Sequence, residues 1–171
     1  AILADMIATG TGIVGMLWET SPSCTEVETH VLDWLVDMMG MPNKFKSSSK
    51  GGGVIQDTAS SSTLISLIGA REYASNGEFN SINDSTKFTA HVSSQSHYSI
   101  EKTIKVAGLG KDSMRCIEVD EKFAMIPSKL KETITQDIAD GFTPAFVCAT
   151  VGTTNTTAMD PIEEIGKICK E

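Results

Sequence analysis

The sequence is poor in aromatic and in basic residues. Of its 171 residues, 6% are aromatic, and 14 Lys and Arg stand against 22 Asp and Glu, for a formal net charge of −8. A chain this acidic has no global attraction for nucleic acid or for an anionic membrane surface, so we expect neither as a partner. An anionic ligand would have to be held by local donors.

Long apolar runs, a secretory leader and paired cysteines are also missing. No apolar run has the length of a membrane span, and no basic, apolar, small-residue segment opens the chain. The four cysteines, Cys24, Cys116, Cys148 and Cys169, are far apart, and the three histidines lack metal-ligand spacing. We therefore expect reduced and mostly buried thiols, no metal site and a cytoplasmic location.

The composition is that of a globular protein: 40% of the residues are hydrophobic, and the chain is long enough to form one sizeable hydrophobic core. The first residue is Ala1 rather than an initiator methionine, and a helical pattern still runs at Glu171. We expect residues 1–171 to form part of a larger domain that is truncated at both ends.

Three glycines at 51–53 introduce a stretch rich in hydroxyl residues, which leads directly into a helical pattern after Thr63. The N–H groups of a first helical turn have no intrahelical partner, and the helix dipole is positive there. This stretch is therefore a candidate phosphate cradle. The alternative is an ordinary loop that ends in a Ser or Thr N-cap.

Helical and strand patterns alternate along the rest of the chain. Helices are expected from Ser23 to Gly40, after the glycine-rich stretch to about Ser75, from His97 to Gly108, from Pro127 to Gly141 and from Asp160 onward. Strands are expected over 88–93, 116–119 and 145–151, and the last is apolar enough to be covered on both faces. This alternation predicts an α/β fold with a mostly parallel sheet flanked by helices.

Two helix starts carry specific capping signals. Ser23 and Glu26 have the spacing of a capping box. Asp160 precedes Pro161, with Glu163 three residues after Asp160, which predicts an aspartate cap with proline in the first helical position. Residues 80–86 are expected to form an exposed connection.

Small polar residues follow three of the predicted elements, at 58–63, 93–97 and 152–157. Ligands of open α/β sheets bind beyond the carboxyl ends of the strands, so these segments predict one polar pocket with phosphate donors and the imidazole of His97. No Gly-Lys-Ser/Thr follows the glycines, which excludes a Walker loop. The closing glycine of a dinucleotide-binding motif is also absent, so a dinucleotide site is only weakly supported.

Several of these motifs together resemble the group II pyridoxal-phosphate-dependent decarboxylases, in particular the aromatic-L-amino-acid decarboxylase branch with its histidine and tyrosine decarboxylase relatives. The matching motifs are Trp18 with Ser21 to Glu28, Asp33 to Leu35, Gly51 to Gln56 with Ala59-Ser60, Ser94 to His97, Ala124-Met125, and Cys148 to Thr154. The resemblance implies a fragment of the large domain of a fold-type I enzyme, with pyridoxal 5'-phosphate as cofactor and an L-aromatic amino acid as substrate. It also implies a homodimer with the active site at the interface.

The resemblance assigns roles to individual residues. The cofactor would contact Thr58, Ala59, Ser60, His97 and Thr154. Thr58 to Ser60 match the phosphate-binding turn, and His97 matches the catalytic histidine that stacks on the pyridine ring and controls protonation after carbon dioxide leaves. Family members that make aldehydes often carry another residue there.

Substrate contacts are implied for Val14, Met16 and Trp18, which match a segment that lines the substrate pocket across the dimer interface. Asp57 departs from a family glycine, and a carboxylate near a phosphate is unfavourable unless it points away. The aspartate that pairs with the pyridinium and the lysine that forms the Schiff base would lie beyond Glu171, so residues 1–171 alone should be inactive.

Two kinds of alternative remain open. Within the family, the substrate could be histidine, glutamate or cysteine sulfinate, or the product could be an aromatic aldehyde. Outside it, the chain could be a non-catalytic α/β module that binds a phosphorylated small molecule at the helix after Gly53.

Overall fold

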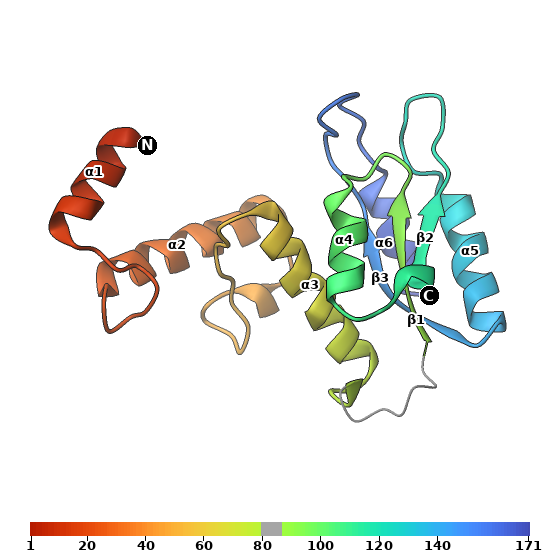
Figure 1. Cartoon of the computed structure of the whole chain (residues 1–171), viewed down its shortest axis with the longest axis horizontal. Helices are drawn as coiled ribbons and strands as arrows, with labels where there is room; N and C mark the ends of the chain where they lie inside the picture. Colours follow the sequence, from red (N-terminus) through yellow and green to blue (C-terminus); the bar gives the residue numbers. More distant parts are fainter. Residues whose placement is uncertain (80–86) are drawn as a thin grey trace. The chain divides into compact units, whose positions relative to one another are not determined.

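The computed structural model describes residues 1–79 and 87–171, so the predicted connection at 80–86 lies outside the described residues. The chain divides into two compact units, residues 1–56 and residues 57–171 (Figure 1). Each unit is described by itself below.

The first unit consists of three helical elements and the segments that join them. They are α1 (Ile2–Thr11), α2 (Pro22–Met38) and the short 3-10 helix η1 (Asn43–Phe45). The predicted capping box at Ser23 is wrong, because α2 begins one residue earlier, with Ser21 as N-cap and Pro22 in the first turn. Proline suits that position, since its missing N–H has no acceptor to find there. The predicted left-handed glycine after the helix is confirmed at Gly40, whose φ is 62°.

The polar segment after α2 is fastened to that helix. The N–H and hydroxyl of Ser47 both donate to the carboxylate of Asp33, at 2.8 and 2.6 Å. Further along, the N–H of Ile55 donates to Glu28 at 2.6 Å. Two carboxylates of α2, Asp33 and Glu28, thus hold the loop that follows the helix.

The second unit holds the sheet. Its elements are α3 (Ala59–Ala74), β1 (Lys87–Ser93), α4 (Ser99–Val106), η3 (Lys111–Ser113), β2 (Met114–Ile117), α5 (Pro127–Ala139), β3 (Phe142–Cys148) and α6 (Ile162–Ile168). The described sheet has three strands in the order β2-β1-β3, and β1 pairs in parallel with both neighbours. The predicted α/β fold with a parallel sheet is therefore confirmed.

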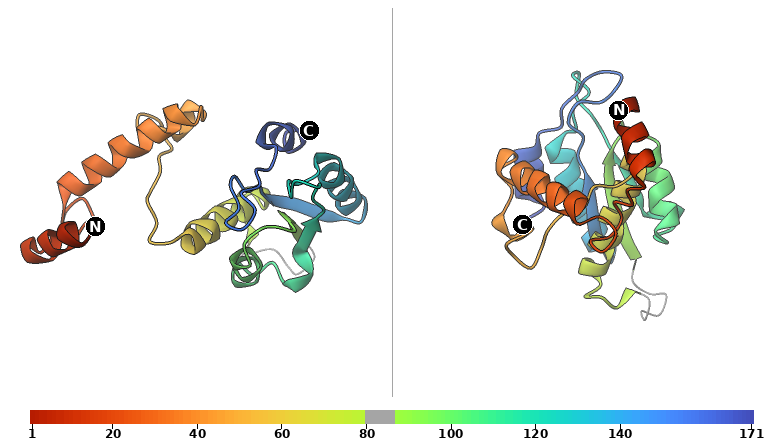
Figure 2. Two further views of the ribbon diagram at one scale, coloured as in Figure 1. Left: turned by 90° about the horizontal axis from the view of Figure 1, so that it is seen from above. Right: turned by 90° about the vertical axis from the view of Figure 1, so that its left-hand side faces the viewer.

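Helices cover both faces of this sheet, as the left view of Figure 2 shows. On one face Leu67 of α3 and Ile104 of α4 pack with Ala90 and Val92 of β1. On the other face Leu130 of α5 packs with residues of α6 and the end of β2. Ala90 and Val92 of β1 thus join the apolar cluster on one face, whereas the alternate residues Thr89, His91 and Ser93 are buried and polar.

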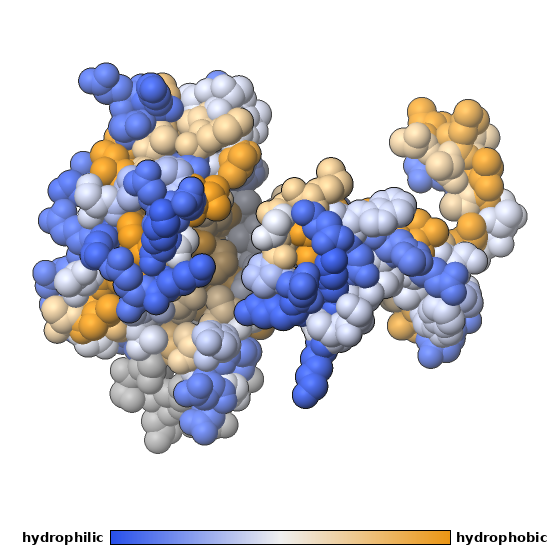
Figure 3. Space-filling model, turned by 180° about the vertical axis from the view of Figure 1, so that it is seen from behind, coloured by the Kyte–Doolittle hydropathy of each residue, from blue (hydrophilic) through white to orange (hydrophobic). Residues whose placement is uncertain are grey.

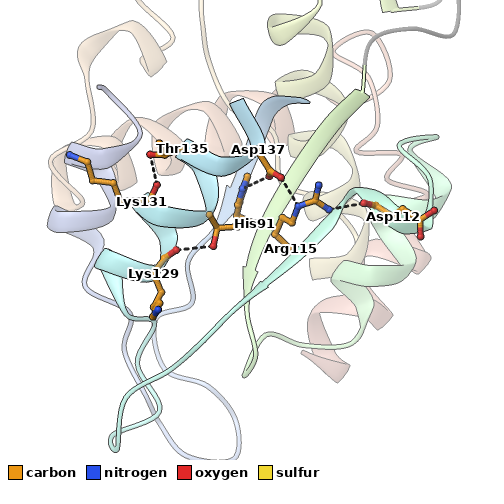
Figure 4. Close-up of polar contacts among 8 residues, drawn as sticks. His91, Asp112, Arg115, Lys129, Lys131, Thr135 and Asp137 are labelled. Carbon is orange, nitrogen blue, oxygen red and sulfur yellow. Dashed lines mark hydrogen bonds and ion pairs between the residues drawn. The ribbon is translucent and has the colours of Figure 1, made fainter. Parts of the chain in front are cut away.

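One polar cluster lies inside the second face of the sheet (Figure 4). The imidazole of His91 on β1 is fully buried, and its Nε2 lies 3.0 Å from the Asp137 carboxylate on α5. The same carboxylate accepts a hydrogen bond of 2.7 Å from Nε of Arg115 on β2. Nε2 and its facing oxygen are not aligned as a hydrogen bond, and the pair is ionic only when His91 is protonated. The cluster ties α5 to both strands.

The predicted third strand differs from what the structure contains. The strand β3 covers Phe142–Cys148 and ends three residues before the predicted limit at Val151. Within the described sheet it is an edge strand, and all seven of its residues are half-buried rather than enclosed. The strand that is enclosed is β1, where six of seven residues are buried. The central position, rather than apolar composition, decides which strand is covered.

The four cysteines are free, but the prediction that most of them are buried is wrong, because Cys24 and Cys148 are half-buried and Cys116 and Cys169 are exposed. Partial burial raises the pKa of the Cys148 and Cys169 thiols, which disfavours their thiolate forms. None of the helices in residues 1–79 and 87–171 has the combined length and apolar character that a membrane crossing needs.

Candidate functional site

A pocket of about 270 Å³ lies at the carboxyl edge of the sheet, where the loops after β1 and β3 meet. Because these strands are parallel neighbours, the loops that follow them emerge side by side at the same edge (Figure 1). The lining comprises residues 95–98 of the first loop, with Thr150 and residues 152–155 of the second. The structure therefore brings together two predicted site residues, His97 and Thr154.

The first loop is a tight turn held by backbone contacts. The N–H of Ser94 donates to the carbonyl of Ile117 at the end of β2, at 3.0 Å. The N–H of Ser96 donates back to the carbonyl of Ser93, at 2.9 Å. These bonds close the chain after the strand and deliver His97 to the start of α4.

His97 is exposed to solvent in the pocket, but its ring is not free to turn. Its Nδ1 lies 2.8 Å from the hydroxyl of Ser99 and 3.3 Å from the N–H of the same residue. The phenol ring of Tyr98 packs beside the imidazole, with 4.2 Å between ring centroids and a tilt of 39°. The predicted catalytic imidazole is thus presented to the pocket in a fixed orientation.

The second loop is fastened at its base by a buried carboxylate. Asp160 is 6% exposed, and its two oxygens accept the N–H groups of Met125 and Thr150, each at 2.7 Å. The N–H of Asp160 donates to the carbonyl of Thr150, at 2.9 Å. The prediction that Asp160 caps the last helix is wrong, because α6 has Pro161 as N-cap. The aspartate instead holds the loop that carries Thr154.

Hydrogen bonds within the second loop hold it in a compact shape. Thr153 and Thr156 share a hydrogen bond of 2.6 Å, and the N–H of Gly152 donates to the carbonyl of Ala158 at 2.9 Å. Gly152 has a φ of 80°, which side chains rarely adopt, so glycine suits this turn. The result is a compact loop in which Thr154 and Asn155 line the pocket.

The donors around the pocket fit a polar, anionic cofactor such as pyridoxal 5'-phosphate. The hydroxyl of Ser96 is buried and has no hydrogen-bond partner among the described residues, although Ser96 lines the pocket. A buried hydroxyl without a partner is costly, and a ligand would relieve that cost. Together with His97, Thr154 and Asn155, it gives the pocket imidazole, hydroxyl and amide groups without a carboxylate in its lining.

The predicted phosphate-binding turn forms the start of α3. Thr58 is the N-cap, and its hydroxyl accepts the N–H of Ser61 at 3.2 Å. The N–H groups of Ala59 and Ser60 occupy the first two helical positions, which leaves them without an intrahelical acceptor. Thr58, Ala59 and Ser60 are not among the residues that line the pocket described above. Their role as phosphate ligands stays a prediction.

Asp57, the residue that departs from the family glycine, is paired within its own turn. Its carboxylate accepts a hydrogen bond from the hydroxyl of Ser61. That bond lowers the pKa of Asp57 below its usual value of 3.8, so the group is ionised at neutral pH. The negative charge is thus turned toward the N-cap side chains.

Val14, Met16 and Trp18 lie in the first unit, on the segment between α1 and α2, and all three are exposed. Within that unit the hydroxyl of Thr20 donates to the carbonyl of Val14 at 2.6 Å, which curls the segment. Their assignment to a substrate pocket stays a prediction.

Three residues that shape the site were missed from the sequence. Asp160 was read as a helix cap because Pro161 follows it, and its backbone partners are 10 and 35 residues away. Tyr98 and Ser99 were read as part of a helix that starts at His97. A serine two residues after a histidine at a helix start was the available signal, since such positions invite side-chain to backbone bonds.

Comparisons with known proteins identify the family of the chain. The family model described as the pyridoxal-dependent decarboxylase conserved domain matches residues 1–171. The chain is 42% identical over 170 residues to tyrosine decarboxylase 2 of Narcissus pseudonarcissus, covering 98% of this chain and 34% of the relative. It is 39% identical over 179 residues to a histidine decarboxylase of Mus musculus, covering 99% and 26%. It is 39% identical over 170 residues to a phenylacetaldehyde synthase of Arabidopsis thaliana, covering 97% and 34%.

Solved structures give the same answer. The crystal structure of Catharanthus roseus tryptophan decarboxylase in complex with L-tryptophan aligns with a TM-score of 0.87 at 39% identity, covering 99% of this chain and 36% of that one. The Oryza sativa TDC structure with PLP and tryptamine aligns with a TM-score of 0.88 at 32% identity, covering 99% and 36%. The chain spans about a third of the length of most of these relatives. On the match over its whole length, the chain belongs to the pyridoxal-dependent decarboxylase family.

Proposed function

We propose that the full-length protein is a pyridoxal-phosphate-dependent decarboxylase that converts L-aromatic amino acids to amines and carbon dioxide. In this proposal residues 1–171 are part of its large, cofactor-binding domain. The observation that carries it is the pocket at the carboxyl edge of the sheet, which joins His97 to Thr154 in a chain of this family.

The residues of this chain would hold and serve the cofactor. When bound, pyridoxal 5'-phosphate supplies an electron-poor ring that takes up the electron pair left as the α-carboxylate departs as carbon dioxide. The N–H groups of Ala59 and Ser60, with Thr58 beside them, would bind the phosphate. His97 would hold the ring and move a proton, and Thr154 would hold the cofactor from the second loop.

An aromatic substrate is supported by the relatives, which include tyrosine and tryptophan decarboxylases. Val14, Met16 and Trp18 supply apolar surface of the kind that holds an aromatic ring, and all three side chains are exposed and so accessible to a ligand. In the family's arrangement this segment reaches the active site of the partner subunit.

A homodimer in the cytoplasm completes the proposal. The apolar side chains of α1 are exposed, with Ile2, Leu3, Met6 and Ile7 all at least 65% accessible, and Figure 3 shows them as an orange patch. Contiguous apolar surface of this kind marks an interface. The free cysteines agree with a reducing compartment.

A second candidate keeps the cofactor and changes the substrate or the product. A histidine decarboxylase and a phenylacetaldehyde synthase match the chain as well as several aromatic decarboxylases do. Retention of His97 favours amine formation over aldehyde formation. The full-length protein therefore has to be assayed with aromatic, imidazole and acidic amino acids side by side.

The test is a product assay on the purified full-length protein with pyridoxal 5'-phosphate. We expect carbon dioxide and amine from tyrosine, tryptophan or dihydroxyphenylalanine, and a visible absorbance that borohydride bleaches. If amine forms only from histidine or an acidic amino acid, the protein is a decarboxylase of the same family with a different substrate. If the absorbance is absent, the proposal fails and the non-catalytic binding module is favoured. The variant His97→Gln should lower kcat about a hundredfold while the cofactor stays bound.

A further inference from the structure

The contacts of His97 determine which ring nitrogen carries the proton. A backbone N–H only donates, and the N–H of Ser99 points to Nδ1 at 3.3 Å. Nδ1 therefore acts as the acceptor, and the Ser99 hydroxyl, at 2.8 Å, is left to donate to the same atom. A neutral imidazole with Nδ1 as acceptor carries its proton on Nε2.

The sequence makes this contact local and rigid. Ser99 is the first residue of α4, so its N–H lacks an intrahelical acceptor. The N-cap residue, Tyr98, gives no side-chain acceptor. The imidazole of His97 takes that place, and the positive end of the helix dipole favours a lone pair at Nδ1 over a second N–H. The helix start and the ring thus stabilise one another.

Nε2 is the other nitrogen of the ring, and His97 is one of the residues that line the pocket. Nε2 has no hydrogen-bond partner in residues 1–79 and 87–171, and His97 is exposed among the pocket-lining residues. The ring of Tyr98 covers part of the imidazole and leaves the rest accessible. Nε2–H is therefore the ring donor that is left for a ligand bound beside His97.

We propose that Ser99 is a positioning residue: through its N–H and hydroxyl it holds His97 as the Nε2–H tautomer, so the proton that His97 moves passes through Nε2. This inference rests on the proposed function for its consequence in turnover. The tautomer itself does not depend on turnover and can be measured separately.

Turnover of the full-length holoenzyme gives the first test. Ser99→Ala removes one of two donors to Nδ1 and should lower kcat about fivefold with KM for the amino acid changed less than about twofold. Ser99→Thr keeps the hydroxyl and should restore kcat. Ser99→Asp places an acceptor beside Nδ1, favours the opposite tautomer, and should lower kcat more than Ser99→Ala does.

Ser128 offers matched controls, because it also lies in the first turn of a helix and makes no side-chain hydrogen bond among the described residues. Ser128→Ala and Ser128→Asp should leave kcat and cofactor absorbance unchanged. Equal losses at both positions, or an unchanged kcat in Ser99→Asp, would overturn the proposal.

Nitrogen-15 spectra of the histidine side chains give the second test. The resonances of His97 are identified by their loss in His97→Gln. We expect a protonated Nε2 and an unprotonated Nδ1 in the wild type, and a protonated Nδ1 in Ser99→Asp. A protonated Nδ1 in the wild type sinks the proposal. If the wild type shows no decarboxylation, the proposed function fails, and the spectra still decide the tautomer.

Discussion

At the scale of single residues, the buried imidazole of His91 makes stability depend on pH. Burial lowers the pKa of His91 below its usual 6.5; Asp137 opposes this shift and Arg115 adds to it. The unfolded chain binds a proton as pH falls through about 6.5, whereas the folded chain binds it only at lower pH. The free energy of unfolding should therefore fall below about pH 6.5, by up to about 1.4 kcal/mol per pH unit.

Urea denaturation of the full-length protein between about pH 7.5 and pH 5.5 measures this slope. His91→Gln removes the titrating group and should flatten it. His30 is a suitable comparison because its imidazole is exposed. His30→Gln should leave the slope as it is. An unchanged slope in His91→Gln would assign the pH dependence to another group.

At the same scale, the side chain of Asp160 should contribute more to the free energy of unfolding than that of an exposed aspartate with the same number of hydrogen bonds. Asp160→Asn replaces one acceptor with a donor that faces a backbone N–H, inside a site that is 6% exposed. We expect a loss of about 2–3 kcal/mol in the free energy of unfolding. Cofactor retention should weaken too, because the loop that carries Thr154 loses its anchor.

Asp120 supplies the matched control. Its carboxylate accepts the N–H groups of Lys122 and Ala124 at 2.8 and 3.0 Å, but the residue is exposed. Water can replace these bonds, so Asp120→Asn should cost less than about 1 kcal/mol. Denaturant titrations that give equal costs for the two substitutions would show that burial of Asp160 is not what matters.

At the scale of elements, the glycine-rich entry has a steric reason at one position. A Cβ at Gly51 would overlap the carbonyl oxygen of Lys44, so the chain can pass there only as glycine. Gly51→Ala should lower the free energy of unfolding by about 1–3 kcal/mol. Gly10→Ala is the control, because it meets nothing within 4 Å and lies in α1, where alanine is the better helix former. It should raise stability by about 0.5–1 kcal/mol, and thermal unfolding of both variants checks the opposite signs.

The elements also show what the sequence could and could not predict. The strand at 88–93 and the end of α3 near Ser75 were predicted within a residue, because their patterns are local, but α3 begins at Ala59 rather than after Thr63. The starts of α2 and α6 were misassigned, since Pro22 decides the first and the long-range bonds of Asp160 remove it from the second. Local capping patterns carry no information about partners 35 residues away.

The candidate site was predictable only as far as its residues follow strands. His97 and Thr154 were placed together because both come after parallel strands, and the structure confirms their shared pocket. The sequence signals a contact between His97 and Ser99 only by their spacing, and its geometry depends on the exact residue at which α4 begins. A difference of one residue there changes which N–H faces the ring.

At the scale of the whole molecule, α1 should contribute to the proposed dimer. Met6 lies on its apolar face and is 65% exposed. Met6→Asp costs the monomer little but places a charge in the interface, so it should weaken dimerisation at least about tenfold. Ala4→Asp lies on the opposite side of the same helix and is the control. Sedimentation of the full-length protein over a range of concentrations measures both, and equal behaviour would exclude this face.

The pairing of β1 with β3 has a consequence for how such a protein can diversify. Adjacent strands are separated by about 4.8 Å wherever they pair, whatever side chains they carry. The two loops that hold His97 and Thr154 follow these paired strands, so the distance between the points where the loops begin is set by the backbone pairing. Other residues of these loops can therefore be substituted, and new substrates bound, while the strand pairing keeps the spacing between the loops of His97 and Thr154.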